Sequence, residues 1–483
     1  MSYFLGIDQG SHSSRAVLFD DNGELVIQAA EPIVPERPGP DCIEYEAGAL
    51  LNSVETVVKC VLGGIEAENR GHIAACGIAT QRSTVLAWDV NGNALSPALS
   101  WQDVRAKSLV DRLKPNEQAI RRLTGLPLTP FYSASKMHWL LHHAEQVMQC
   151  ERGNLRLSPL VSYLLFHLLD NKPYVIDYSN AQRTQLFDVD ALTWSRRLCG
   201  WFEIDISRLP LCQPMCASYG RLSATTIPVT AVCGDQNAAM FGIGKLEQGV
   251  ALINIGSGAF VLRELDGYSD SATQITGIAL ADQRGVSYMR EATINGAGNA
   301  LSWAEKRWGV DKLAEMLPEW MQVVTEPPVF INAVGGLGTP WMRGDIGSTF
   351  VGSGEHTAAE KAVAIIESIV FMIQVNLELM GAEAPFNKIR VSGGLSNLDG
   401  LCQKLSNLSG LEVVRSHVAE ASARGAAWLA AGRPGNWNIT TADDTRLVRF
   451  KPQPAERLQM RYRVFQSELD RILSASQRAG GIQ

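Results

Sequence analysis

The 483-residue sequence lacks the features that would place the protein in a membrane or on a nucleic acid. It has no unbroken run of 18 apolar residues, and no basic segment followed by a signal-like apolar stretch stands at its N-terminus. Lys and Arg total 43 against 50 Asp and Glu, so the net charge is −7 and there is no basic surplus to bind a phosphate backbone. We therefore expect a cytoplasmic protein whose main partner is neither a nucleic acid nor a membrane.

Cysteine and histidine patterns give no sign of a disulfide framework or a zinc site. The nine cysteines are scattered and odd in number, and the closest pair, Cys212 and Cys216, has no second Cys or His cluster at zinc spacing. The eight histidines form no HExxH motif. His138, His142 and His143 fall in one expected helix, over 134–148, where we interpret them as surface or satisfied core residues.

Four common enzyme signatures are also missing. The chain contains no GxxxxGK[ST], which excludes a P-loop, and no GxGxxG after a strand, which leaves a dinucleotide fold without its fingerprint. It contains neither GxSxG nor the protein-kinase motif set. Nucleotide chemistry, if present, must therefore depend on other backbone turns.

The sequence does contain a glycine-serine hairpin near the start of each half. In the stretch from Gly6 to Asp20, two apolar runs flank a turn of small polar residues, and the first run ends in Asp8. The stretch 250–263 repeats this pattern, with a turn at Gly256-Ser257-Gly258. Since 483 residues also favour two domains, we predict domains 1–240 and 241–483.

Two further strand ends carry possible chemistry. An apolar strand over 227–233 ends in Gly234-Asp235, and a later strand passes through Gly393-Gly394 into a helix. A glycine turn before a helix offers free backbone amides to an anion, and paired carboxylates suit Mg²⁺ and a hydroxyl nucleophile. The alternatives are structural: Asp8 at a polar hairpin tip, and Asp235 as a helix N-cap.

The chain resembles the FGGY carbohydrate kinases of the actin/hexokinase superfamily, and most of all their glycerol-kinase branch. The resemblance runs from Leu5 to about Gly432. It rests on eight segments in the right order: DQGSHSSRAVLFD, TQRSTVLAWD, SWQDVRA, FYSASKMHWL, DYSNAQRTQLFD, GDQNAAMFG, NIGSGAF and VSGGLSN. It implies an α/β fold with two actin-like (ribonuclease H-like) domains flanking a deep ATP and substrate cleft.

The resemblance also implies roles for individual residues in an ATP- and Mg²⁺-dependent kinase. Asp235 matches the catalytic base, and Asp8 and Asp235 match the metal-binding carboxylates. The ATP-binding positions are Gly10, Ser11, His12, Ser13, Arg15, Ser257, Gly298, Gly393, Gly394 and Asn397. The substrate-binding positions are Arg82, Ser83, Trp101, Phe131, Asp235, Gln236 and Phe260.

Three of these positions depart from the glycerol-kinase pattern. Ser83 stands where a glutamate is expected, Phe131 where a tyrosine is expected, and His12 replaces a threonine or serine. A serine cannot replace a charged acceptor of hydroxyl hydrogens and leaves extra volume, so a somewhat larger polyol or a ketose could fit. Trp101 and Phe260 as plain core aromatics, and Arg82 paired with a structural carboxylate, remain open.

The leading hypothesis is a kinase of a small polyol or sugar. The enzyme alternative is a pentulose kinase of the xylulose or ribulose type. The alternative of another class is a catalytically weak nucleotide- or sugar-binding sensor. The resemblance further allows a homo-oligomer, either a dimer or a tetramer.

Overall fold

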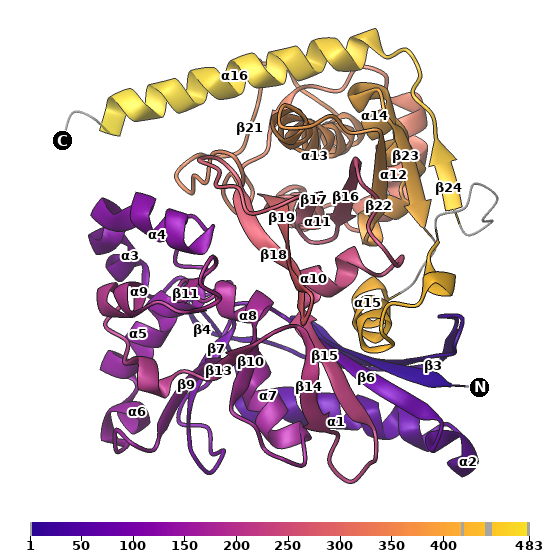
Figure 1. The fold of residues 1–483 in the computed structure, drawn as a ribbon. Helices are drawn as coiled ribbons and strands as arrows, with labels where there is room; N and C mark the ends of the chain where they lie inside the picture. Colours follow the sequence, from indigo (N-terminus) through magenta and orange to yellow (C-terminus); the bar gives the residue numbers. More distant parts are fainter. Residues whose placement is uncertain (1, 417–419, 440–446, 481–483) are drawn as a thin grey trace.

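The first glycine-serine hairpin forms as predicted, from β1 (Tyr3–Gln9) and β2 (Ser13–Phe19). The two strands pair antiparallel, so that Asp8 lies opposite Arg15. They belong to a six-stranded sheet in the lower half of Figure 1. The computed structural model describes residues 2–416, 420–439 and 447–480. In order across the sheet, the strands are β14 (Cys216–Arg221), β15 (Pro228–Gly234), β6 (Ile73–Thr80), β1, β2 and β3 (Leu25–Pro32).

A second sheet of seven strands repeats this arrangement (Figure 1, upper right). In order they are β18 (Ile275–Asp282), β19 (Gly285–Ile294), β17 (Ala259–Leu265), β16 (Val250–Ile255), β22 (Lys388–Ser392), β23 (Glu412–Ser416) and β24 (Leu447–Phe450). In each sheet an antiparallel hairpin (β1–β2, β16–β17) is followed by two parallel strands and an antiparallel edge strand. The predicted repetition of the opening hairpin is thus a repetition of a whole α/β unit.

The parallel strands bring the candidate residues to one edge of each sheet. Parallel neighbours end at the same edge, and β6 lies between β1 and β15 with parallel pairing on both sides. Asp8 therefore lies at the same edge as Asp235, which directly follows β15, and two strand spacings, about 10 Å, separate their backbones. Arg82 follows β6 at this edge, and Ser257 follows β16 at the matching edge of the second sheet.

Smaller sheets extend both units. A five-stranded sheet contains β4 (Glu36–Gly39), β5 (Cys42–Tyr45), β8 (Ala98–Leu99), β7 (Val85–Asp89) and β9 (Leu155–Pro159). The two-stranded sheets are β10 (Val175–Asp177) with β13 (Leu211–Gln213), β11 (Phe187–Asp188) with β12 (Thr193–Trp194), and β20 (Phe330–Ile331) with β21 (Thr349–Phe350).

Helices cover the faces of the sheets. The first unit contains α1 (Ala47–Gly63), α2 (Ala67–Arg70), α3 (Lys107–Leu113), η1 (Lys114–Asn116), α4 (Glu117–Thr124), α5 (Ser133–His143), α6 (Glu145–Gln149), α7 (Leu160–Leu168), α8 (Tyr178–Gln182), α9 (Arg196–Trp201), η2 (Ile206–Arg208) and α10 (Asp235–Met240). The rest of the chain contains α11 (Gly298–Trp308), α12 (Leu313–Val323), α13 (Ala358–Gly381), η3 (Gly394–Asn397), α14 (Asp399–Ser409), α15 (Ala421–Ala430), η4 (Gly435–Trp437) and α16 (Glu456–Gly480).

One late helix packs on the early sheet. Although α15 comes near the end of the chain, it lies against β1, β6 and β15 (Figure 1). Its alanines join the core of the first sheet, and that core also contains Leu262, Ile278 and Met289 from the second sheet. A continuous apolar core thus crosses from one unit to the other.

Helix α13 is the only described helix that is long and apolar enough to span a membrane. Its best 18-residue window has a mean hydropathy of 1.8, but 83% of that window is buried inside the protein. Thr357 caps its N-terminus in a capping box with Glu360. Since α13 packs on α12, α14 and the second sheet, it is the central core helix of that unit.

The single helix predicted over 134–148 is wrong, because the chain forms two helices there. Ala144 has an extended backbone (φ −87°, ψ 113°) that ends α5 and starts α6. The change of direction buries Val147 in the core of the five-stranded sheet. Burial of one apolar side chain therefore overrides the continuous helical pattern.

Candidate active site

The turn of the first hairpin is short and held on both sides. Gly10 N donates to Ser13 O at 3.0 Å, and Ile33 N donates to His12 O at 2.8 Å. The side chain of His12 is exposed, whereas Ser11 and Ser13 are half-buried. Arg15 lies on β2 and forms an ion pair with Glu420 at 3.3 Å, which links the hairpin to the start of α15.

The turn of the second hairpin meets two of the predicted glycines. Gly298 N donates to Gly256 O, and Asn299 N donates to Ser257 O, both at 2.9 Å. Gly393 has a φ of +89°, and a Cβ there would lie 2.6 Å from Ile255 O, so only glycine fits this approach. Ser257, Gly298 and Gly393 therefore gather at the end of β16.

The remaining predicted nucleotide positions lie on the adjoining turn. Gly394 and Asn397 are the first and last residues of η3, and both are exposed, as is Gly393. Exposed glycines between a strand and a helix leave the backbone accessible to a ligand.

The two strand-end carboxylates differ in their surroundings. Asp8 is only 7% exposed, and its Oδ1 is buried with no hydrogen-bond partner among the described residues. Burial and the neighbouring Asp235 raise the pKa of Asp8 to about 7. A buried carboxylate oxygen without a donor is costly, and a bound cation would satisfy it. The pair Asp8 and Asp235 therefore fits a Mg²⁺ site, although other cations share this preference for oxygen.

Asp235 is the first residue of α10 and not its N-cap, which is Gly234. Its Oδ1 accepts a hydrogen bond from Gln236 N at 2.7 Å and lies 3.8 Å from Arg82 Nε. Burial raises the pKa of Asp235, and Arg82 opposes that shift. Hydrogen bonds from the backbone and the side chain of Gln236 also lower the pKa of Asp235, so the carboxylate is oriented by its neighbour and, when ionised, can accept a proton.

Arg82 also contacts a carboxylate that the sequence analysis did not identify. Its Nη1 and Nη2 donate to the two oxygens of Glu291, at 3.2 and 3.4 Å. Glu291 lies on β19, is fully buried, and accepts a third charged hydrogen bond from Arg183. The two guanidinium groups keep the pKa of Glu291 below its usual value, against the effect of burial. Glu291 is therefore a carboxylate with which Arg82 could pair for a structural reason, as the alternative interpretation of Arg82 requires.

Two aromatic side chains remain partly open beside this edge. Trp101 and Phe131 are each 37% exposed, and Trp101 Nε1 donates to Ser11 Oγ at 2.9 Å. Lys136, which is fully buried, donates to Ser100 O at 2.9 Å and to Phe131 O at 2.8 Å. One buried ammonium group thus ties together the backbone segments that carry both rings.

Ser83 does not face open space. Its side chain is 5% exposed, and Oγ donates to the backbone carbonyl of Arg183 at 3.1 Å. Its φ of 66° lies in the left-handed region. The hydroxyl is therefore engaged in holding two loops together, and the structure does not bring it to the other substrate-side groups as a free acceptor.

The last two predicted substrate positions differ in access. Gln236 lines a pocket between α10 and the second sheet, together with Asn254 and Ser392, and its Oε1 has no hydrogen-bond partner among the described residues. Phe260 is partly buried on β17 and packs against the core that crosses between the units. Both side chains are half-buried, and only Gln236 lines this pocket.

Glu291 and Arg183 are the residues that sequence reasoning missed. Arg183 lies within the quoted segment DYSNAQRTQLFD, and Glu291 lies within the strand segment GVSYMREATI. A charged residue inside an apolar strand pattern was the available signal, since charges are rarely buried without a partner.

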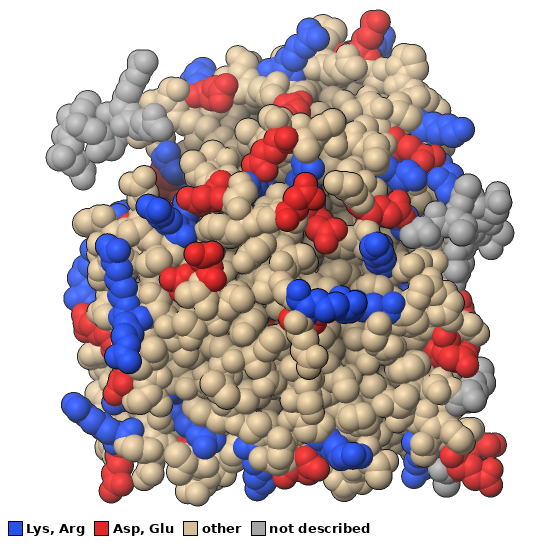
Figure 2. Space-filling model, viewed as in Figure 1, with Lys and Arg blue, Asp and Glu red and all other residues tan. Residues whose placement is uncertain are grey.

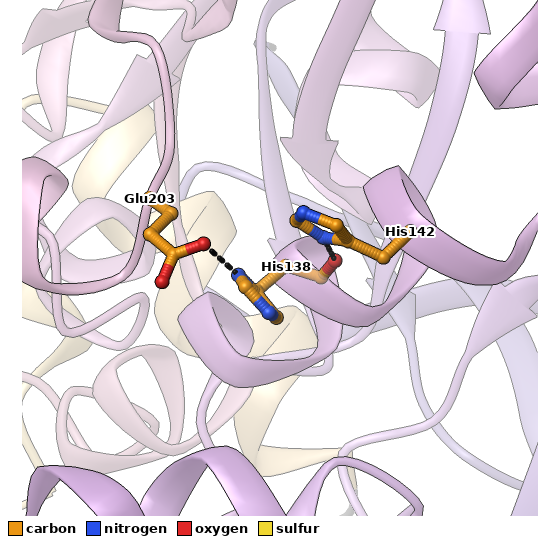
Figure 3. A group of neighbouring side chains, drawn as sticks. All are labelled: His138, His142 and Glu203. Carbon is orange, nitrogen blue, oxygen red and sulfur yellow. Dashed lines mark hydrogen bonds and ion pairs between the residues drawn. The ribbon is translucent and has the colours of Figure 1, made fainter.

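His138, His142 and Glu203 form a separate group outside this site (Figure 3). Their candidate ligand atoms lie within 4.8 Å of one another. Nδ1 of each histidine already contacts a backbone carbonyl, at 3.1 and 2.8 Å, and Glu203 faces Nδ1 of His138 at 3.8 Å. The carboxylate therefore does not face a free ring nitrogen, and we assign no metal to this group.

Comparisons with known proteins agree with the two repeated units. Residues 3–242 match the N-terminal domain of the FGGY family of carbohydrate kinases, and residues 251–432 match its C-terminal domain. The chain is 33% identical over 479 residues to a glycerol kinase from Geobacter sp. (strain M21), covering 94% of this chain and 95% of that protein. It is 31% identical to a glycerol kinase from Geobacillus sp. (strain WCH70), covering 95% and 96%.

Solved structures share the fold. Plasmodium falciparum glycerol kinase with ADP superposes with a TM-score of 0.84 at 24% identity, covering 98% of both chains. A ligand-bound xylulose kinase from Lactobacillus acidophilus gives 0.86 at 21% identity, covering 99% of both. The predicted two-domain, actin-like α/β fold is confirmed. The chain belongs to the FGGY family of carbohydrate kinases and is an ATP-dependent sugar or polyol kinase.

Proposed function

We propose that the protein transfers the γ-phosphoryl group of ATP to a hydroxyl group of a small polyol or sugar, with Asp235 as general base. One observation carries the proposal: the Asp235 carboxylate lies half-buried at the sheet edge that also holds Asp8, with its Oδ1 beside Arg82 Nε and Gln236 N. A carboxylate within hydrogen-bond reach of a hydroxyl group can accept its proton during attack on phosphorus.

The chemical step then follows from the placement of the side chains. The acceptor hydroxyl loses its proton to Asp235 as its oxygen bonds to the γ-phosphorus, and the bond from that phosphorus to the ADP oxygen breaks. Arg82, whose Nε faces Asp235, would hold a hydroxyl oxygen of the acceptor. Asp8 and Asp235 would hold Mg²⁺, which neutralises phosphate charge when bound.

The nucleotide contacts are assigned to the backbone turns. The turn Gly10–Ser13 and Arg15 would approach the γ-phosphate from the first unit, and Ser257 would approach from the second. Gly298, Gly393, Gly394 and Asn397 would surround the adenosine end. The support is their common placement at the ends of β1 and β16.

The acceptor is assigned by chemical class. The proteins at 31–33% identity are named glycerol kinases, which favours a small polyol. The partly exposed rings of Trp101 and Phe131 offer apolar faces for the C–H groups of such a molecule. Ser83, in place of a glutamate, removes one charged contact, so acceptance of a larger polyol or a ketose is part of the proposal.

Two further features belong to the proposal. We expect a cytoplasmic location. We also expect a homodimer or a homotetramer, and sedimentation of the purified protein would measure this oligomeric state. Acidic and basic side chains alternate on the face shown in Figure 2, and neither charge forms a continuous patch among the residues drawn there.

A coupled ADP-release assay with MgATP tests the function against a panel of polyols, ketoses and aldoses. We expect turnover with a polyol, and a fall of about 10²–10⁴-fold in kcat for Asp235→Asn with ATP binding retained. Asp205→Asn, at an exposed aspartate beside η2, is the matched control and should keep full activity. Turnover with pentuloses alone would move the assignment to a pentulose kinase, and ATP binding without turnover would favour a sensor.

A further inference from the structure

A buried group of three charges connects the two family domains at the proposed acceptor site. Glu291 lies in the matched C-terminal domain, whereas Arg82 and Arg183 lie in the matched N-terminal domain. The side chains of Arg82, Arg183 and Glu291 are 9%, 4% and 1% exposed. One carboxylate from the second domain thus holds two guanidinium groups of the first.

Glu291 leaves part of Arg82 free. The Glu291 carboxylate accepts hydrogen bonds from Arg82 Nη1 and Nη2 at 3.2 and 3.4 Å. The Nε atom of Arg82 faces Asp235 Oδ1 at 3.8 Å. Nη1 also donates to Asn237 Oδ1 at 3.4 Å, which is a weak contact. A guanidinium group held at its fork has few remaining orientations, so its Nε edge is fixed beside the proposed base.

Arg183 fixes Glu291 in turn. Its Nη2 donates to the same Glu291 oxygen that Arg82 Nη1 contacts, and its carbonyl accepts the Ser83 hydroxyl next to Arg82. The buried carboxylate is therefore charged, fully paired and unable to rotate without losing a charged hydrogen bond.

We propose that Glu291 is a positioning residue that holds Arg82 beside Asp235, so that the acceptor site is complete only when the second domain is seated on the first. This inference rests on the proposed kinase function. The carboxylate that holds Arg82 comes from Glu291, on β19 in the other domain. Acceptor affinity should therefore depend on Glu291 through Arg82, while ATP affinity should not.

A double-mutant cycle tests this dependence. We expect Glu291→Gln to raise the KM for the acceptor about tenfold, the scale of one charged hydrogen bond, and to change the KM for ATP less than about twofold. In an Arg82→Ala background, Glu291→Gln should have less than about a twofold further effect on the acceptor KM, because its target is already gone.

Matched variants separate positioning from general stability. Glu383→Gln breaks the ion pair with Arg290, the neighbour of Glu291 on β19, and should leave both KM values unchanged. Glu291→Asp keeps the charge and should give a folded protein with an acceptor KM between those of wild type and Glu291→Gln. This variant decides the matter if Glu291→Gln does not fold.

The outcomes distinguish the two levels of the proposal. Absence of turnover by the wild type with every acceptor overturns the proposed function and this inference together. Wild-type turnover with equal effects of Glu291→Gln in both backgrounds, or with an equal rise in the KM for ATP, overturns the inference alone. An acceptor KM unchanged in Glu291→Asp also overturns it.

Discussion

Trp101 and Ser11 are joined by a hydrogen bond of 2.9 Å from the indole Nε1 to the serine Oγ. Ser11 belongs to the first phosphate hairpin of the proposed site, and Trp101 belongs to its acceptor side. Tyr45 Oη also donates to Ser11 O at 3.0 Å, so the serine is held from two directions. The proposed phosphate-binding hairpin and the proposed acceptor site are therefore in direct contact within the first domain.

Trp101→Phe tests this contact, because it keeps an aromatic face and removes the indole donor. Loss of one hydrogen bond corresponds to about 0.5–1.5 kcal/mol, so kcat/KM should fall about two- to tenfold with either ATP or acceptor varied. Trp194→Phe is the control, since its indole donates to Pro210 O away from the site. Equal kinetic changes in the two variants would contradict a specific role for the contact.

Asp8→Asn tests the cation site. The amide is a poorer ligand and carries no charge, so the Mg²⁺ concentration for half-maximal activity should rise at least about tenfold. Titration of metal into EDTA-treated protein measures this value. Asp20→Asn changes an aspartate at the other end of the same hairpin, and it should titrate like the wild type. An unchanged Mg²⁺ requirement in Asp8→Asn would remove Asp8 from the proposed metal site.

Lys136→Met removes the two hydrogen bonds that tie Ser100 O to Phe131 O. Two buried carbonyls then lose their donor, so we expect the rings of Trp101 and Phe131 to shift and the acceptor KM to rise several-fold, with a small change in the KM for ATP. Lys59→Met, on the exposed face of α1, should change neither value.

The same variant carries a pH prediction for stability. Burial lowers the pKa of Lys136 to about 7, below the ordinary value of 10.5 that it has in the unfolded chain. Between these values the unfolded chain binds more protons than the folded one, so this group makes the free energy of unfolding rise with pH from about 7 to 10.5. Lys136 therefore lowers the free energy of unfolding most below pH 7. Urea unfolding at pH 6.5 and 9 measures the free energy of unfolding of both proteins. The value for Lys136→Met minus that for the wild type should be higher at pH 6.5 than at pH 9. A difference that is higher at pH 9 would contradict the lowered pKa.

Ser83→Ala tests whether the serine hydroxyl contacts the acceptor. Because Oγ donates to the Arg183 carbonyl, we expect a loss of about 1 kcal/mol in the free energy of unfolding and an acceptor KM within about twofold of wild type. Chemical denaturation and steady-state kinetics measure both. A large rise in KM without loss of stability would show that Ser83 binds the acceptor directly.

Local signals in the sequence predicted the first glycine-serine hairpin. The hairpin around Gly10–Ser13 formed as predicted because small polar residues separate two apolar runs. Where local pattern and burial disagreed, burial decided. Ala144 breaks a continuous helical pattern because the chain turns there to bury Val147.

The sequence by itself determined the repeated glycine-serine hairpins and the strand-end carboxylates Asp8 and Asp235, because each depends on residues close together in the chain. Only the tertiary structure decided the partners of the charges. Glu291 and Arg82 are 209 positions apart and meet only when β19 of one domain packs beside the end of β6 in the other. A buried charge needs a partner of opposite charge, and for residues this far apart in the sequence the long-range packing of the chain decides which residue that partner is.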